Sequence, residues 1–218
     1  MEILPNHTFV PFGPYLAQME VDPKYCAKVL KLGKTLKKRF SKKLAGQIHN
    51  EYGFDLKKHP WLFEEFKVYI DTWIYGWGNF RRSNDYNVDY SLKEMWINRM
   101  VPKEYNPPHV HQHCDLSFVL FLEVPEGMKG EAKKKKTTAP HPGQTSFIYG
   151  ENRWDTVSEI VFTPKKNILL MFPNNLRHYV MHFDSPGERI SVSGNIIFNH
   201  GGRNFWKKKL VVREPDEK

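Results

Sequence analysis

Residues 109–124 read HVHQHCDLSFVLFLEV. The first half places a histidine at every second position and ends in an aspartate, and the second half is a nearly continuous apolar run. Alternate side chains of an extended chain point to the same side, so the three histidines and Asp115 can all face one spot. The stretch therefore predicts a buried strand at 116–124, directly preceded by a candidate metal site.

Further short apolar or alternating runs, separated by turn residues, lie on both sides of this stretch. They read EMWINRMV, TSFIYGE, EIVFT, NILLMF, HYVMHF and RISVSGNIIFN. Seven or eight short strands at this close spacing, all after residue 94, predict a β-sandwich or barrel.

Two helices are expected before the strands. Asp22 followed by Pro23 is a helix start, and apolar residues recur at helical spacing from there to about residue 40. A second start at His59–Pro60 leads into an aromatic stripe that the glycines of YGWGN end at about residue 76 or 77. Helices first and strands later predict an α+β fold, with helices supporting one face of a β-structure.

The length of 218 residues fits a single domain, expected as a helical support region at 1–93, a core at 94–200 and a tail at 201–218. With 40% hydrophobic and 14% aromatic residues, a wholly disordered chain is excluded. No apolar run approaches the ~18 residues of a membrane span, and the first residues lack the pattern of a signal peptide. The two cysteines, Cys26 and Cys114, form no disulfide framework, although a bridge between them stays open. We expect a cytoplasmic protein with no membrane partner.

The formal net charge of +9 comes largely from a few segments. These are the outer face of the first helix and the lysine runs at 133–136 and 207–209. No basic stripe interleaved with aromatics is present, so we interpret the excess as a solvated basic surface and leave nucleic acid open as a partner without a supporting motif. The lysine-rich segment 127–145 is expected to be a mobile loop, with a lid over the substrate as one hypothesis for its role.

Two more motifs fit the alternating histidines. Imidazole and carboxylate ligands together suit Fe(II), and His178, which opens a strand after a Pro-Asn-Asn turn, is the natural distant ligand. Arg189 and Ser191 lie two apart on a strand and project to one side. There a guanidinium can hold a carboxylate through two hydrogen bonds, and the hydroxyl adds another.

On these motifs the sequence resembles the 2-oxoglutarate and Fe(II)-dependent dioxygenases, whose core is a double-stranded β-helix, a jelly roll of the cupin type. It looks most like a bacterial and phage branch related to prolyl hydroxylases. The resemblance covers about residues 94–199. The matching segments are Trp96 with Asn98, NPPHVH at 106–111, LSFVLFLEVP at 116–125, FPNNLRHYV at 172–180 and RISVSGN at 189–195.

The resemblance implies roles for individual residues. His109 and His178 bind the metal, with His111 or Asp115 as the third ligand, and the triad of His113, Asp115 and His178 is the second choice. The catalytic group is then His109, His111 and His178, while 2-oxoglutarate is bound by Arg189, Ser191 and Asn98.

The implied reaction uses Fe(II) as cofactor and 2-oxoglutarate and O2 as co-substrates. It hydroxylates a C–H bond of an amino-acid side chain, prolyl or other, in a peptide, or of a small metabolite, and 2-oxoglutarate is decarboxylated to succinate. Two other classes stay open. One is a cupin-like Zn-dependent hydrolase or isomerase, and the other is a metal-free jelly-roll binding protein.

Overall fold

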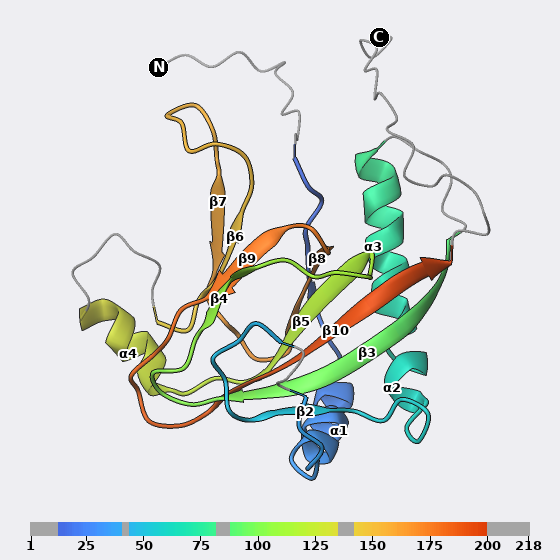
Figure 1. Cartoon of the computed structure of the whole chain (residues 1–218), viewed down its shortest axis with the longest axis horizontal. Helices are drawn as coiled ribbons and strands as arrows, with labels where there is room; N and C mark the ends of the chain where they lie inside the picture. The colour runs from blue at the N-terminus through green and yellow to red at the C-terminus, as the bar shows by residue number, and fades with distance from the viewer. Residues whose placement is uncertain (1–12, 41–43, 82–87, 135–141, 200–218) are drawn as a thin grey trace.

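Two antiparallel sheets face each other in the computed structural model, which describes residues 13–40, 44–81, 88–134 and 142–199 (Figure 1). The six-stranded major sheet has the order β1-β8-β5-β10-β3-β2 and the four-stranded minor sheet the order β4-β9-β6-β7. The strands of the major sheet are β1 (Ala17–Glu20), β2 (Glu51–Gly53), β3 (Asp89–Met100), β5 (Leu116–Glu123), β8 (Ile168–Pro173) and β10 (Arg189–Asn199). Those of the minor sheet are β4 (Asn106–His109), β6 (Thr145–Ile148), β7 (Glu159–Phe162) and β9 (Arg177–Val180).

The eight strands from β3 to β10 alternate between the two sheets except at the β6–β7 hairpin, which lies in the minor sheet, and this is the arrangement of a jelly roll. Each of the apolar runs after residue 94 forms one of these strands. The predicted α+β class with a double-stranded β-helix core is therefore confirmed.

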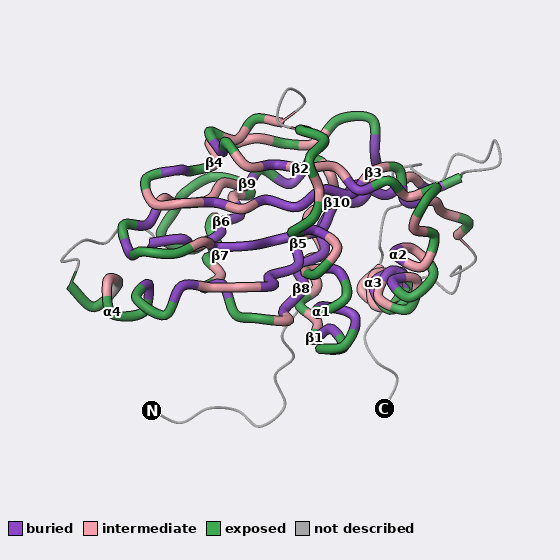
Figure 2. Tube along the Cα trace, turned by 90° about the horizontal axis from the view of Figure 1, so that it is seen from below, coloured by how far each residue is buried: buried purple, intermediate pink, exposed green. Residues whose placement is uncertain are grey.

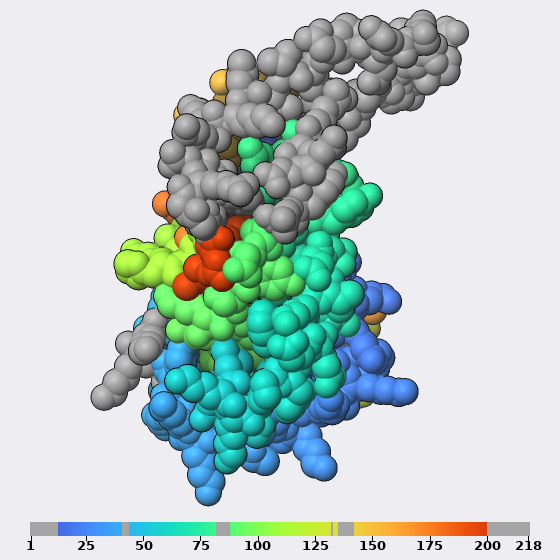
Figure 3. Space-filling view, turned by 90° about the vertical axis from the view of Figure 1, so that its right-hand side faces the viewer, coloured from blue at the N-terminus to red at the C-terminus, as the bar shows by residue number. Residues whose placement is uncertain are grey.

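The helices pack on the outer face of the major sheet. They are α1 (Pro23–Gly33), α2 (Trp61–Glu64) and α3 (Lys67–Phe80). Buried side chains of α1 and α3, such as Val29, Ile70 and Trp73, join Ile97, Leu120 and other strand residues in the largest apolar cluster. Figure 3 shows this N-terminal part, in blue and teal, forming one continuous surface beside the green β3. The helices thus brace the sheet that carries half of the cavity described below.

Both predicted helices differ from the structure in their bounds. The first ends at Gly33 and not near residue 40. At this position a Cβ would come within 2.4 Å of Ile97 Cδ1, so the close packing of the helix end on β3 requires a glycine. The second is divided into α2 and α3, and it continues through the glycines to Phe80. Gly76 does not stop the helix. It leaves room for the Tyr15 side chain, whose hydroxyl oxygen would lie 2.0 Å from a Cβ added at this position.

The segment 127–145 is not a continuous loop, and that prediction was wrong for its first half. Residues Gly127–Lys134 form α4, while 135–141 lie outside the described residues. Met128 is buried against a small apolar cluster, and Glu131 accepts hydrogen bonds from the backbone N–H groups of Asp184 and Ser185. These contacts attach α4 to the connection between β9 and β10.

The space between the sheets is filled at one end by a second apolar cluster, which includes Phe121, Phe147 and Phe172. On the other side of the major sheet, Gly194 of β10 lies directly under Phe118, where an added Cβ would meet the ring at 2.6 Å.

Cys26 and Cys114 are both buried and free, so the bridge left open by the sequence is not formed. No helix among the described residues is long and apolar enough to cross a membrane. The proposed tail at 201–218 lies outside the described residues.

Candidate metal centre and its cavity

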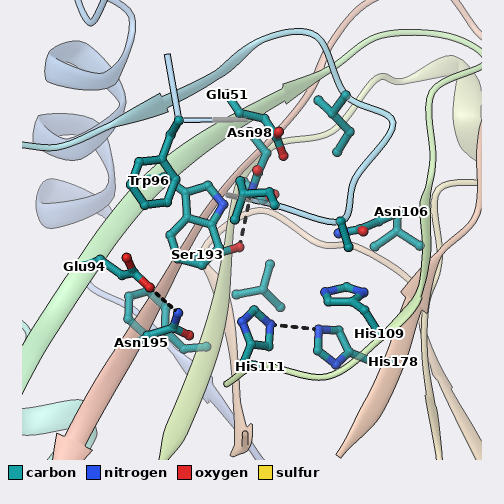
Figure 4. Close-up of a pocket in the computed structure, with 18 of the residues that line it drawn as sticks. Glu51, Glu94, Trp96, Asn98, Asn106, His109, His111, His178, Ser193 and Asn195 are labelled. Carbon is teal, nitrogen blue, oxygen red and sulfur yellow. Dashed lines mark hydrogen bonds between the residues drawn. The ribbon is translucent and has the colours of Figure 1, made fainter. Parts of the chain in front are cut away.

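Three histidines converge between the sheets. His109 ends β4, His111 follows it, and His178 lies on β9 directly opposite His109. One ligand nitrogen from each lies within 4.8 Å of the others, and Nε2 of His111 is 3.3 Å from Nε2 of His178. Two nitrogens that bind one ion at ~2.1 Å are separated by about 3 Å, so the donor spacing fits a metal. Figure 4 shows the three rings facing one another on one side of the cavity.

Backbone carbonyl groups orient two of these rings. Nδ1 of His109 lies 2.8 Å from the carbonyl oxygen of Pro107, and Nδ1 of His178 lies 2.9 Å from that of Leu176. A carbonyl oxygen only accepts, so Nδ1 carries the proton in both rings and Nε2 keeps its lone pair. Such an outer hydrogen bond is the usual support of a metal-binding histidine.

Burial keeps all three imidazoles neutral. It lowers the pKa of His111 to about 4, with the neighbouring His109 adding to the effect. It also lowers the pKa of His109, and it holds the pKa of His178 well below the ordinary 6.5. Metal binding is opposed by positively charged imidazoles, and at neutral pH the three rings carry no such charge.

The alternation of side chains ends after His111. His113 has a φ of 58°, in the left-handed region, and this residue turns the chain out of its extended path. Oδ2 of Asp115 accepts a hydrogen bond of 2.8 Å from the backbone N–H of Phe198. Neither His113 nor Asp115 belongs to the group that the structure brings together among its described residues.

Arg189 is the buried cation of the same cavity. Only 2% of its surface is exposed. Its Nε donates a hydrogen bond to the carbonyl oxygen of Gly143 and its Nη2 donates one to Oγ1 of Thr145, both at 3.0 Å. The guanidinium lies 5.0 Å from the centre of the Phe121 ring. Burial lowers its pKa to about 10, which leaves it charged at neutral pH. In the described part of the chain no carboxylate lies within ion-pair distance. A buried guanidinium without a counter-ion indicates a site for an anion.

Ser191 and Asn98 complete the wall beside this arginine. Ser191 on β10 is paired with Asn98 on β3, and Asn98 is paired in turn with Glu51 on β2. The amide of Asn98 donates to Oγ of Ser193 at 3.2 Å. The structure thus brings Arg189, Ser191 and Asn98 to the cavity that the histidines line.

The cavity has a volume of about 440 Å³, which is within the usual range of small-molecule sites. Glu51 and Asn106 are among the polar lining residues to which the sequence assigned no role. Glu51 lies in a three-residue strand, too short to show a periodic signal. Asn106 is part of the NPPHVH motif, which was the only available hint.

The fold and the site together are typical of the oxygenases with a double-stranded β-helix core that depend on Fe(II) and 2-oxoglutarate. Residues 94–195 match the model of a family described as "Putative 2OG-Fe(II) oxygenase". Over these residues the resemblance to the 2-oxoglutarate and Fe(II)-dependent oxygenases that was stated from the sequence is confirmed. No curated protein matches the chain in sequence.

Solved structures with the same fold are numerous, and three illustrate the likeness. An oxidoreductase of the 2OG-Fe(II) oxygenase family from Burkholderia pseudomallei is 14% identical, with a TM-score of 0.57 over 84% of each chain. The viral collagen prolyl hydroxylase of Paramecium Bursaria Chlorella virus-1, in complex with 2OG, is 16% identical, with a TM-score of 0.54 over 84% of this chain and 96% of that one. HygX from Streptomyces hygroscopicus, with nickel and 2-oxoglutarate bound, is 9% identical, with a TM-score of 0.55 over 84% of this chain and 82% of that one. At these identities the likeness is one of fold.

Proposed function

We propose that this protein is a 2-oxoglutarate and Fe(II)-dependent hydroxylase that acts on a C–H bond of an amino-acid side chain, prolyl or other, in a peptide, or of a small metabolite. The observation that carries the proposal is the combination, in one cavity, of three neutral histidines and a buried arginine without an acidic partner among the described residues. The viral neighbour is a collagen prolyl hydroxylase, which supports a peptide as the substrate.

His109, His111 and His178 would hold Fe(II) through nitrogen atoms. Three neutral ligands leave the charge of the ion uncompensated by protein, and this favours an anionic co-substrate on the open positions. Bound iron and 2-oxoglutarate supply the O2-dependent oxidation of the C–H bond, with release of succinate and CO2.

The residues of the chain would bind and orient these groups. Arg189 and Ser191 would hold the carboxylate of 2-oxoglutarate that is remote from the metal, and Asn98 would line the space between. The ring of Phe172, 4.7 Å from that of His178, and the neighbouring Phe147 limit the access of water to the metal side.

The test is an anaerobic titration of the metal-free protein with Fe(II) and then with 2-oxoglutarate, followed through the weak visible charge-transfer band of a chelated keto acid. We expect the band in the unchanged protein and its loss in His178→Ala. Arg189→Met should bind 2-oxoglutarate at least ~100-fold more weakly, because the remote carboxylate of the co-substrate would be buried without a cationic partner. Arg177→Met, at an exposed arginine next to His178, is the control and keeps the band.

Two other results would contradict the proposal. Tight metal binding without any 2-oxoglutarate band would favour the Zn-dependent hydrolase or isomerase. Failure to bind a metal at all would favour a metal-free binding protein.

A further inference from the structure

Two buried oxygen atoms of the cavity have no hydrogen-bond partner among the described residues. They are Oε2 of Glu51 and Oδ1 of Asn106, and both residues line the cavity. Buried acceptors are satisfied in nearly all native proteins, so an unsatisfied pair in a ligand cavity points to donors supplied by the ligand.

The two residues lie at the same edge of the sandwich. Glu51 belongs to β2, the edge strand of the major sheet, and Asn106 to β4, the edge strand of the minor sheet. Figure 2 shows β2 and β4 along the same side of the molecule, and Figure 4 shows both side chains above the histidines. Leu44, Ala45 and Ile48 line the cavity next to them. This edge is therefore the side from which a substrate group can be held next to the metal.

The edge is separate from the proposed carboxylate site. Ser191, Asn98 and Glu51 form one row across three adjacent strands, so the backbones of Ser191 and Glu51 are about 10 Å apart. Asn98 lies between them. A molecule bound at the edge and 2-oxoglutarate bound at Arg189 can occupy the cavity together.

The chemistry of the pair selects a cation. An ionised carboxylate and an amide oxygen only accept hydrogen bonds, and an ammonium or guanidinium group only donates them. Glu51 is 1% exposed, and in the described residues no lysine or arginine lies within ion-pair distance of it. Burial and the charge of the neighbouring Glu104 raise the pKa of Glu51 to about 7, so a cationic partner would also stabilise its ionised form.

We propose that Glu51 and Asn106 form a subsite for a positively charged nitrogen group of the substrate, the ammonium of a lysine-like side chain or the guanidinium of an arginine-like one. This inference rests on the proposed function, because the subsite positions a carbon of the same molecule next to the metal. It narrows the substrate class to compounds that carry a basic group near the hydroxylated carbon.

Binding of two matched pairs of probes tests the subsite. The cationic probes are Nα-acetyl-lysine amide and Nα-acetyl-arginine amide, and their neutral counterparts are the corresponding norleucine and citrulline amides. Calorimetric titrations are made under anaerobic conditions on the protein loaded with Fe(II) and 2-oxoglutarate. We expect at least one cationic probe to bind about tenfold or more tightly than its counterpart, as a charge-assisted hydrogen bond provides.

Three variants locate the preference. Glu51→Gln should bring the ratio of dissociation constants close to one, and Asn106→Ala should weaken the cationic probe while leaving its counterpart nearly unchanged. Glu94→Gln is the matched control, since Glu94 also lines the cavity but already accepts a hydrogen bond of 2.7 Å from Nδ2 of Asn195. It should keep the preference.

The inference would be overturned if both members of each pair bound equally well, or if no probe bound at all. A preference for the cationic probe that survives Glu51→Gln would also overturn it. The 2-oxoglutarate band is recorded in the same samples. Its absence from the unchanged protein refutes the proposed function, and the probe titrations repeated without iron and 2-oxoglutarate then still decide whether the subsite binds a cation.

Discussion

Replacing Glu51 by glutamine should make the protein more stable at neutral pH. Burial, reinforced by the charge of Glu104, raises the pKa of this carboxyl from its ordinary 4.5 to about 7. A raised carboxyl pKa means that the folded state binds the proton more tightly than the unfolded state. The protonated carboxyl of Glu51 contributes fully to the free energy of unfolding below pH 4.5. This contribution is lost as the pH rises to 7, and the free energy of unfolding falls by about 3 kcal/mol.

The assay is urea unfolding of the metal-free protein at several pH values between 4.5 and 8, for the unchanged protein and for Glu51→Gln. The difference in the free energy of unfolding should grow by about 3 kcal/mol in favour of the variant over this range. Glu123→Gln, at a partly exposed glutamate paired with Lys34, is the control and should change by less than about 1 kcal/mol. Parallel curves for Glu51→Gln and the unchanged protein would refute this explanation of the buried carboxyl.

Three further predictions concern the metal ligands, the sheet and α4. In a metal titration, His111→Ala should lower the affinity for Fe(II) or Ni(II) at least tenfold, and His113→Ala should leave it unchanged. The reverse result would favour the alternative triad of His113, Asp115 and His178. Gly194→Ala should lower the free energy of unfolding in urea by about 1–3 kcal/mol, because the added Cβ meets the Phe118 ring. Gly130→Ala, which has open space around it in α4, should not destabilise the protein. Equal stability of the two variants would contradict the packing described. Glu131→Ala should remove about 1–3 kcal/mol and speed hydrogen exchange in α4, while unchanged exchange would show that this carboxylate does not hold the helix.

The strands and the histidine pair were predictable because their signals are local. An apolar run bounded by turns marks a strand wherever it pairs, and His109 and His111 keep their alternation because the chain between them stays extended. Asp115 departs from this row only because His113 adopts a positive φ, which no side-chain pattern reports.

The unpredicted parts of the site depend on contacts that are distant in sequence. β2 has three residues, so Glu51 shows its position only through pairing with β3. The close approach of Gly33, at the end of α1, to Ile97 is likewise a contact between residues distant in sequence. α4 lies in a lysine-rich segment of loop-like composition and is attached through Met128 and Glu131. Composition alone carries none of this information.

The position of Glu51 outside the family-matched stretch bears on how such a protein changes over time. The proposed ligands of metal and co-substrate all lie within residues 94–195, while part of the cavity edge comes from residues 44–51. The two stretches are separated by more than 40 residues of the sequence and meet only in the folded chain. Mutation in residues 44–51 can therefore alter this edge of the cavity while the proposed ligands stay unchanged, so kinship in the core is a poor guide to shared substrates.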